Sequence, residues 1–429
     1  MNRPSDGRGA RPAFSGIDAG RLGRVSDAPR GPWRRVTAGA GLLGADGAPR
    51  PTIFAEMSAL ATRTGSINLG QGFPDEDGPL EIVERAQMVI GSGQNQYPPG
   101  VGMQDLREAI AEHQRRWYGL EVDPDTEVLV TAGATEAIAA TILAFAEAGD
   151  EVVVPEPYYD AYAGITALAG ARLVPVPVAA PSFLPDPEEL AAAMTARTRL
   201  VLLNTPHNPS GAVYPRETLS AIVAAAERHD ALIVSDEVYE HLVFDGVHLP
   251  VASIPGAWER TISISSGGKT FSVTGWKVGW VTAPAPLVQA VLAVKQFLTF
   301  VASGPFQPAV AEGLRLPDTV FTGAAETLRQ KRDVLSAGLE AAGFTVYRPS
   351  AGYFVNVDTA PLGHPDAAAL ARELPARIGV VGIPVAALVS AGHRDRFASL
   401  LRFAFCKRLD VLEEAVERLG GLAPAAKAP

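Results

Sequence analysis

TRLVLLN (residues 198–204), ETLSAIVAAAERH (217–229) and ALIVSD (231–236) follow one another in the middle of the chain. The first and third are short apolar runs, and the Ala-rich segment between them has the pattern of a helix. Continuous apolar runs bounded by helices are typical of strands buried in a parallel sheet. This unit therefore predicts an α/β domain wound around a mostly parallel sheet.

The same pattern continues on both sides of this unit. Residues 135–148 read as another helix, and we expect further strands at Glu127–Thr131, Glu151–Val154, Thr261–Ser265 and Gly279–Thr282. A large domain is therefore expected over residues 82–318. After it, mostly helical sequence is interrupted by GYFVNV (352–357) and LRFAF (401–405). We expect residues 319–429 and 51–81 to form a smaller α+β domain.

Composition argues for a soluble enzyme acting on small molecules. The 429 residues are 47% hydrophobic and 20% charged, and the formal net charge of −10 does not favour a nucleic-acid partner. No apolar run approaches the ~18 residues that span a bilayer, so no membrane association is expected. The single cysteine, Cys406, excludes an intrachain disulfide and a thiolate metal cluster, and fits a cytoplasmic protein.

Residues 1–50 differ from the rest of the chain. They contain nine Arg, ten Gly and five Pro but no Lys and no Glu, and they show no helical or strand periodicity. Without an apolar core segment they do not resemble a secretory signal. We expect a disordered N-terminal extension over residues 1–50.

Polar residues follow the predicted strands at the positions where ligands bind in such sheets. Ligands of open α/β sheets lie at the carboxyl ends of the strands. The polar segments at these ends are Gly133–Thr135, Asn208, Asp236–Tyr239 and Ser265–Lys269. We therefore expect the functional site among them.

Lys269, in SSGGKT (265–270), has several possible roles. A lysine in a Gly/Ser loop is most often a solvated surface residue. Because Gly-Lys-Thr follows a strand, a nucleotide-binding P-loop is a second interpretation. That motif requires glycine at position 263, where this chain has Ser263, and the acidic strand ending at Asp236 precedes the lysine loop instead of following it.

Pyridoxal phosphate (PLP) chemistry accounts for more of these residues. A lysine amine forms a Schiff base with the PLP aldehyde, and an acidic group must face the pyridine nitrogen to make the ring an electron sink. Asp236 ends a buried apolar strand, where a carboxylate needs a cationic partner. Taken alone, Asp236 has the alternative interpretation of a helix N-cap.

Four motifs in order resemble the signatures of class I/II aminotransferases, which are fold-type-I PLP enzymes: TPHNPSG (205–211), SDEVY (235–239), SGGKTF (266–271) and GWKVGW (275–280). The similarity covers nearly everything from about Pro51 to Gly420. It implies an α/β fold-type-I PLP-transferase with a large wound domain and a small α+β domain. It also implies an aminotransferase that exchanges an amino group between an amino acid and a 2-oxo acid.

The resemblance assigns cofactor-binding roles to particular residues. Lys269 would carry PLP and move the proton at the substrate Cα, and Asp236 would pair with the pyridinium. The remaining roles are hydrogen bonding of the phenolic oxygen by Asn208 and Tyr239, stacking by Tyr159, and phosphate binding by Ala134, Thr135, Ser266 and Lys277. Many relatives have arginine where this chain has Lys277, and lysine keeps the charge but not the bidentate fork.

Further roles concern the substrate and the assembly. Arg402 resembles the clamp for the substrate α-carboxylate, together with Asn208, and Gly72 would let backbone approach the same group. Tyr97 matches a position that reaches the phosphate of the neighbouring subunit, which implies an active homodimer. No metal ligand set is expected.

The substrate is implied only loosely. FAEMSALA (54–61), LGQGFPDEDGP (69–79) and RFAFCKRLD (402–410) look most like actinobacterial N-succinyldiaminopimelate aminotransferases of lysine biosynthesis, with glutamate and 2-oxoglutarate as one couple. Residues 266–280 resemble kynurenine/glutamine aminotransferases equally. A methionine-type aminotransferase and a cysteine-conjugate β-lyase are further alternatives. A transcription regulator on this fold would need an N-terminal helix-turn-helix, which residues 1–50 do not supply.

Overall fold

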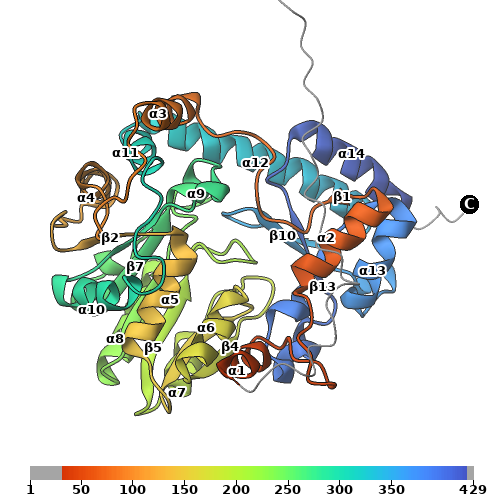
Figure 1. Cartoon of the computed structure of the whole chain (residues 1–429). Coiled ribbons are helices and arrows are strands. Elements are labelled where there is room, and N and C mark those ends of the chain that lie inside the picture. Colours follow the sequence, from red (N-terminus) through yellow and green to blue (C-terminus); the bar gives the residue numbers. More distant parts are fainter. Residues whose placement is uncertain (1–30, 423–429) are drawn as a thin grey trace, which may run out of the picture.

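The central feature of the computed structural model, which describes residues 31–422, is a seven-stranded sheet (Figure 1). Its strand order is β2-β8-β7-β6-β5-β3-β4, and only β8 runs antiparallel to its neighbours. The strands are β2 (Val128–Thr131), β3 (Glu151–Glu156), β4 (Arg172–Pro177), β5 (Thr198–Asn204), β6 (Leu232–Asp236), β7 (Thr261–Ser266) and β8 (Gly279–Thr282). The predicted wound, mostly parallel sheet is confirmed.

All six strands expected from the sequence are present, and β4 was missed. Its sequence, RLVPVP, contains Pro175 and Pro177, and it carries less buried side chains than its neighbour β3. Proline cannot donate to a strand ladder, so it is tolerated mainly in edge strands. β4 is an edge strand, paired with β3 alone, and this position accounts for both features.

Helices cover both faces of this sheet because consecutive strand residues are apolar, and successive side chains point to opposite faces. Leu200 and Leu202 of β5 pack with one group of helices, and Val201 and Leu203 pack with another. The first group is α5 (Gly133–Phe145), α6 (Ala161–Ala169) and α10 (Ala285–Lys295), and the second is α7 (Pro187–Ala193) and α8 (Arg216–Arg228). A third core beside β2 and β8 contains α3 (Leu80–Gly91), α4 (Gln104–Tyr118) and α11 (Gln307–Leu314).

A smaller, antiparallel sheet lies on the other side of the molecule (Figure 1). Its strands, in the order β12-β13-β10-β9, are β9 (Thr345–Tyr347), β10 (Phe354–Asp358), β12 (Ile383–Pro384) and β13 (Leu400–Ala404). β1 (Ile67–Asn68) pairs in parallel with β11 (Val380–Val381). The surrounding helices are α2 (Ile53–Thr64), α12 (Asp318–Ala341), α13 (Ala367–Ile378) and α14 (Leu409–Leu419).

Residues from both ends of the chain share the core of this smaller part. Met57, Ala61 and Leu69 pack in one buried cluster with residues between 335 and 422. This packing supports the predicted grouping of residues 51–81 with 319–429, and we propose that domain division, with residues 82–318 as the large domain.

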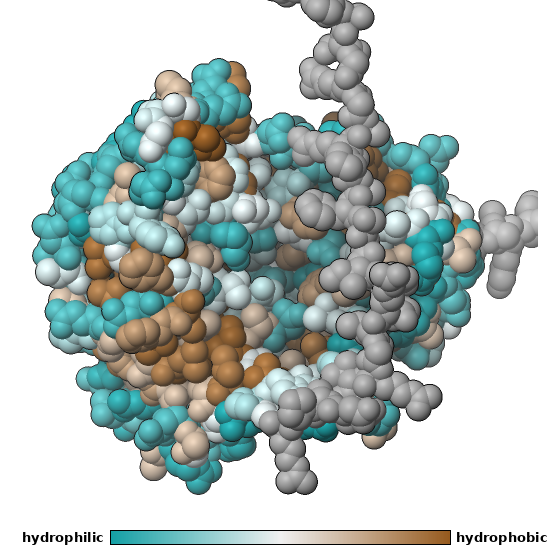
Figure 2. All heavy atoms as spheres, in the orientation of Figure 1, coloured by the Kyte–Doolittle hydropathy of each residue, from teal (hydrophilic) through white to brown (hydrophobic). Residues whose placement is uncertain are grey.

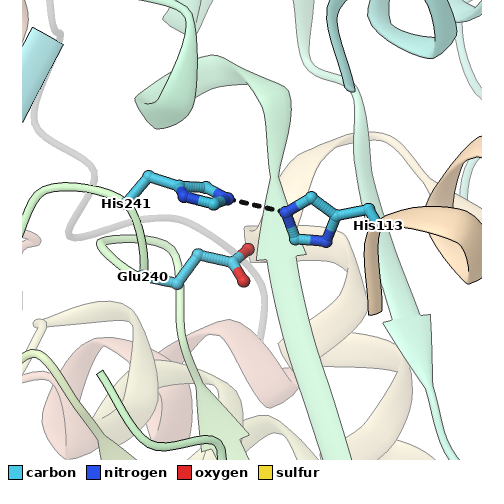
Figure 3. Close-up of side chains that lie close together, drawn as sticks. All are labelled: His113, Glu240 and His241. Carbon is cyan, nitrogen blue, oxygen red and sulfur yellow. Dashed lines mark hydrogen bonds between the residues drawn. The ribbon is translucent and has the colours of Figure 1, made fainter. Parts of the chain in front are cut away.

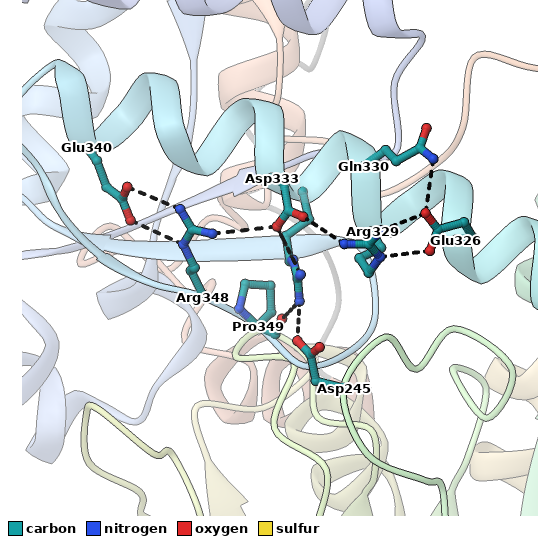
Figure 4. Close-up of polar contacts among 9 residues, drawn as sticks. Asp245, Glu326, Arg329, Gln330, Asp333, Glu340, Arg348 and Pro349 are labelled. Carbon is teal, nitrogen blue, oxygen red and sulfur yellow. Dashed lines mark hydrogen bonds and ion pairs between the residues drawn. The ribbon is translucent and has the colours of Figure 1, made fainter.

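A polar network along α12 connects it to loops on its flank (Figure 4). Arg332 donates to the carbonyl of Pro349 at 2.9 Å and forms an ion pair with Asp245, which lies in the loop after β6. Asp333 accepts from Arg332 and from Arg329, one turn earlier on the helix. Because Asp245 belongs to the large part of the chain, this network joins the two parts through charged groups.

The expected disorder of residues 1–50 is wrong for residues 31–50, while residues 1–30 lie outside the described part of the chain. α1 (Pro32–Gly39) packs on α6, and the Arg35 guanidinium donates to the carbonyls of Ala167 and Leu168 at 2.7 and 3.1 Å. A Cβ on Gly39 would lie 2.3 Å from that of Ala167, so glycine permits this contact. Such a short helix is held by tertiary contacts, which residue periodicity does not reveal. No helix among the described residues is long and apolar enough to cross a membrane.

Candidate active site

A cavity of about 230 Å³ opens at the carboxyl ends of β2, β5, β6 and β7. It brings together nine of the predicted site residues, which come from segments more than 140 positions apart. They are Ala134, Thr135, Tyr159, Asn208, Asp236, Tyr239, Ser266, Lys269 and Lys277. The position of this cavity agrees with the general rule for ligand sites in wound sheets.

Lys269 lies in α9 (Gly267–Thr270), directly after β7. Its ammonium donates to the carbonyl of Gly72 at 2.9 Å and lies 5.1 Å from the ring centre of Tyr353. Burial lowers the pKa of Lys269 to about 8, against an ordinary 10.5. At pH 7 about one-tenth of an amine with this pKa is in the neutral, nucleophilic form.

Asp236 ends β6, and its side chain faces the same cavity. Tyr162 on α6 donates to its Oδ2 at 2.6 Å, and the backbone N–H of Val238 donates to its Oδ1 at 3.4 Å. Burial raises the pKa of Asp236 to about 6, although the hydrogen bond from Tyr162 opposes that rise. Among the described residues no cation lies within ion-pair distance of this carboxylate. A protonated ring nitrogen in the cavity would supply the missing partner.

The start of α5 forms a cradle for an anion. Gly133 has φ +75°, and a Cβ there would lie 3.0 Å from Nζ of Lys277. A Cβ on Gly279 would lie 2.6 Å from the carbonyl carbon of Gly133, so only glycine allows this approach. The first N–H groups of a helix are unpaired and carry its positive dipole end. With Lys277 beside them, Ala134 and Thr135 are suited to a phosphate.

Arg402, on β13, is buried beside the cavity. Its Nη1 donates to Oδ1 of Asn208 at 3.1 Å and its Nη2 to the carbonyl of Gly70 at 3.0 Å, while the buried Nε has no partner in the described chain. Burial lowers the pKa of Arg402 to about 10. A buried guanidinium without a carboxylate partner among the described residues fits a substrate carboxylate.

Gly72 lies next to Lys269 through its carbonyl. A Cβ at this position would lie 2.2 Å from Cζ of Phe354, the ring over which the Arg402 guanidinium lies at 3.8 Å. Position 72 therefore requires glycine, because any side chain there would collide with the Phe354 ring on which Arg402 packs. The predicted contact between the Gly72 backbone and a substrate carboxylate is not tested by this geometry and stays a prediction.

Tyr97 lies outside the cavity. It is 81% exposed and contacts Phe300 edge-to-face, with ring centres 5.6 Å apart. Such exposure of a large ring leaves it available to another chain, so the predicted role across a subunit boundary stays a prediction.

Several residues at this site were not expected from the sequence. Asn204 lines the cavity, donates to the carbonyl of Asp236 at 2.9 Å and accepts from the N–H of Asn208 at 2.7 Å. The hydroxyl of Tyr353 donates to the carbonyl of Lys269 at 3.0 Å. Tyr162, three positions after Tyr159, supports Asp236. Its place in the first turn of α6, three positions after Tyr159, is the only sequence signal that could have drawn attention to it.

A buried cluster behind the cavity contains His113, Glu240 and His241 (Figure 3). The two Nε2 atoms are 2.6 Å apart, and burial lowers the pKa of His113 to about 3. These neutral rings therefore share a hydrogen bond. Two nitrogen ligands on a tetrahedral zinc, each at ~2.0–2.1 Å, would stand roughly 3.3 Å apart. We assign no metal to this cluster.

All the site residues described above lie in the part of the chain that matches known proteins. Residues 64–419 match the family described as aminotransferase class I and II. The probable N-succinyldiaminopimelate aminotransferase DapC of Mycobacterium tuberculosis is 49% identical over 381 residues, which make up 87% of this chain and 96% of that protein. The methionine aminotransferase of Escherichia coli is 41% identical over 370 residues, or 86% and 95% of the two chains. The solved structure of the M. tuberculosis N-succinyldiaminopimelate aminotransferase has a TM-score of 0.85 at 50% identity, covering 87% of this chain and 97% of that one.

Proposed function

Because this chain belongs to the class I and II aminotransferases, we propose that it transfers the amino group of an N-acylated diaminopimelate, with glutamate and 2-oxoglutarate as the second couple. The chain is a PLP-dependent aminotransferase acting on amino acids and 2-oxo acids, and the predicted α/β, fold-type-I architecture is confirmed. The succinylated substrate is proposed from the 49% identical relative named for it.

The residues of the cavity fit this cofactor. When bound, PLP supplies an electron sink for the bond that breaks at the substrate Cα. Lys269 would hold it covalently through Nζ, and the freed amine would move the proton at Cα. Asp236 would pair with the ring nitrogen, and Tyr159 would cover the ring face. Support comes from the buried Asp236 carboxylate, which forms no ion pair with a cation of residues 31–422, and from the Lys269 amine, whose pKa burial lowers.

The other cavity residues would orient and enclose the two ligands. Asn208 already uses its Oδ1 to accept from Arg402, so its amide N–H groups are directed to other acceptors. We propose that these N–H groups and Tyr239 hold the phenolic oxygen of the cofactor. Ser266 lines the cavity at the end of β7 beside Lys277, and both would bind the phosphate.

Arg402 is the residue that would bind the substrate carboxylate. Its guanidinium is buried, has an unpartnered Nε, and contacts Asn208 at the edge of the cofactor cavity. A carboxylate there would be held within reach of Lys269 in a site with little water. Every amino acid and 2-oxo acid carries such a group, so Arg402 suits both half-reactions.

A substrate screen tests the proposed specificity. Purified holoenzyme would be assayed with 2-oxoglutarate as acceptor and with succinyl-diaminopimelate, kynurenine, glutamine and methionine as donors. We expect succinyl-diaminopimelate to have the highest kcat/KM. If one of the other donors exceeds it tenfold, the substrate assignment is wrong and a kynurenine- or methionine-type enzyme replaces it. Release of pyruvate and a thiol from a cysteine conjugate would instead reveal β-lyase activity.

We further propose a cytoplasmic homodimer. Hydrophobic side chains gather over α5 on the face shown in Figure 2, and the large apolar residues Tyr97, Phe297 and Phe300 are exposed. Exposed apolar patches of this kind favour a protein interface. Sedimentation should give a dimer, and a Tyr97→Ala variant should bind PLP more weakly. A fully active monomer at assay concentrations would contradict the dimer.

A further inference from the structure

A groove of about 710 Å³ lies beside the cofactor cavity and takes no part in the roles assigned above. It runs between the segment after α1, the start of α2, α6, and the two short helices η7 (Val385–Leu388) and η8 (Ala391–Phe397). Asp160 lines it and directly follows Tyr159, which lines the cavity. Groove and cavity are therefore neighbours.

Arg402 lies between the cofactor cavity and the groove. Its guanidinium lies 5.3 Å from the ring centre of Phe54, and Phe54 follows Ile53, which lines the groove. The positive charge of Arg402 also acts on Asp160, whose pKa is raised by burial. A substrate whose α-carboxylate binds Arg402 can thus direct a long side chain toward the groove.

Three arginines line the groove, and they differ in their partners. Arg372 donates to Oε1 of Glu56 at 2.8 Å, so its charge is matched. Arg50 and Arg394 form no ion pair with any carboxylate of the described chain. Both are exposed and lie against residues 41–44: Nε of Arg50 lies 3.1 Å from the Cβ position of Gly44, which Oδ1 of Asp46 approaches at 2.5 Å, and Nη2 of Arg394 lies 3.6 Å from the Cβ position of Gly41.

The charged residues that line the groove indicate that it binds an anion. The acids of the groove are Glu56, paired with Arg372, and Asp160, on the side of Arg402. Two guanidiniums at one end of the groove, neither in an ion pair within the described chain, favour an anion, and their planar forks match a carboxylate. A short donor such as glutamate ends near Arg402, whereas the terminal carboxylate of a succinylated diaminopimelate extends roughly 11 Å beyond the reacting carbon.

We propose that Arg50 and Arg394 form a distal subsite that binds the terminal carboxylate of long, N-acylated dicarboxylic amino acids. The subsite rests on the proposed function, since it identifies how such a substrate would be distinguished from methionine or kynurenine. Neither of those donors carries an anionic end that could reach the groove.

The test is a binding measurement with ligands that cannot react. 2-(Succinylamino)heptanedioate lacks the transferable amine but keeps the terminal carboxylate, and 2-acetamidoheptanedioate lacks both. Calorimetric titration of the holoenzyme with each ligand gives a ratio of dissociation constants. We expect the succinyl ligand to bind about tenfold more tightly, the effect of one or two partly exposed charge-assisted contacts. This preference should weaken as salt is added.

Variants assign the preference to residues. Arg50→Ala and Arg394→Ala should each lower the ratio several-fold, and the double variant should bring it close to one. Arg396→Ala is the matched control, because Arg396 is exposed on the same short helix η8 but does not line the groove. Melting temperatures would verify that each variant is folded, and Arg394→Lys should retain part of the preference.

The outcomes separate the subsite from the proposed function. A ratio near one in the unaltered enzyme, or a ratio unchanged in the double variant, overturns the subsite. If succinyl-diaminopimelate is not a donor but the ratio still depends on Arg50 and Arg394, the proposed function fails and the subsite stands for another long dicarboxylate.

Discussion

Replacing Arg402 with methionine separates what this residue does for the substrate from what it does for the fold. Methionine keeps much of the buried volume but removes the charge, the donation to Asn208 at 3.1 Å and the donation to Gly70 at 3.0 Å. The guanidinium is buried over the ring of Phe54 and that of Phe354, where a thioether also packs well.

The expected change in stability follows from the pKa of Arg402. Burial lowers that pKa from its ordinary, higher value to about 10, which corresponds to roughly 3 kcal/mol of unfavourable charge burial. A base whose folded-state pKa is depressed destabilises the fold at every pH below that pKa, so this cost is present throughout the neutral range. Losing two hydrogen bonds donated by a charged group costs about 1.5 kcal/mol or more each. The two effects nearly cancel, and the variant should be about as stable as the original enzyme.

The expected change in activity is much larger. Without the guanidinium, the substrate carboxylate loses a desolvated charge-assisted pair worth ~1.5–3 kcal/mol or more, so KM for donor and acceptor should rise ten- to over a hundredfold. Thermal melts of the holoenzyme and steady-state kinetics with both substrates measure the two quantities. A melting temperature lowered by more than about 5 °C, or an unchanged KM, would refute this account of Arg402.

Three further predictions concern the cofactor cavity. Borohydride reduction of the holoenzyme should fix PLP on Lys269, and Lys269→Ala should lose turnover by several orders of magnitude, as peptide mapping and kinetics will report. Tyr162→Phe removes the hydrogen bond to Asp236 and should raise the pKa of that carboxyl, so the acidic limb of kcat/KM should move to higher pH by about one unit. Gly133→Ala places a Cβ 3.0 Å from Nζ of Lys277 at φ +75°, and should weaken PLP binding about tenfold in an absorbance titration.

Each of these has a control on the same chain. A label found on Lys295 would contradict the assignment of the cofactor lysine, because Lys295 donates to the carbonyls of Gly100 and Phe300 away from the cavity. An acidic limb unmoved in Tyr162→Phe would show that Asp236 does not control it. Gly149 has φ +103° with open space around its Cβ position, so Gly149→Ala should be strained without affecting PLP affinity.

The sequence alone predicted six of the seven strands of the large sheet, its mostly parallel character, and the residues expected to hold the cofactor. Apolar runs such as residues 198–204 are buried on both faces, so their pattern survives without tertiary information. Lys269 and Asp236 stand in short motifs directly after strands, where backbone topology already assigns them to one edge. β4 and α1 were not predicted because neither shows a clear residue periodicity. β4 is tolerated as an edge strand, and α1 is held by its contact with α6.

Only the tertiary structure determined what surrounds these residues. The carbonyl of Gly72 meets Lys269 across 197 positions, and Asn208 meets Arg402 across 194. Packing likewise places Tyr162 beside Asp236 and brings Arg50 and Arg394 to residues 41–44. It also buries Arg402 where no carboxylate of residues 31–422 pairs with it. A motif encodes which group is chemically able to act, because that depends on the residue itself. Its pKa and its partners depend on which distant elements exclude water from it, and only the folded chain brings those elements together.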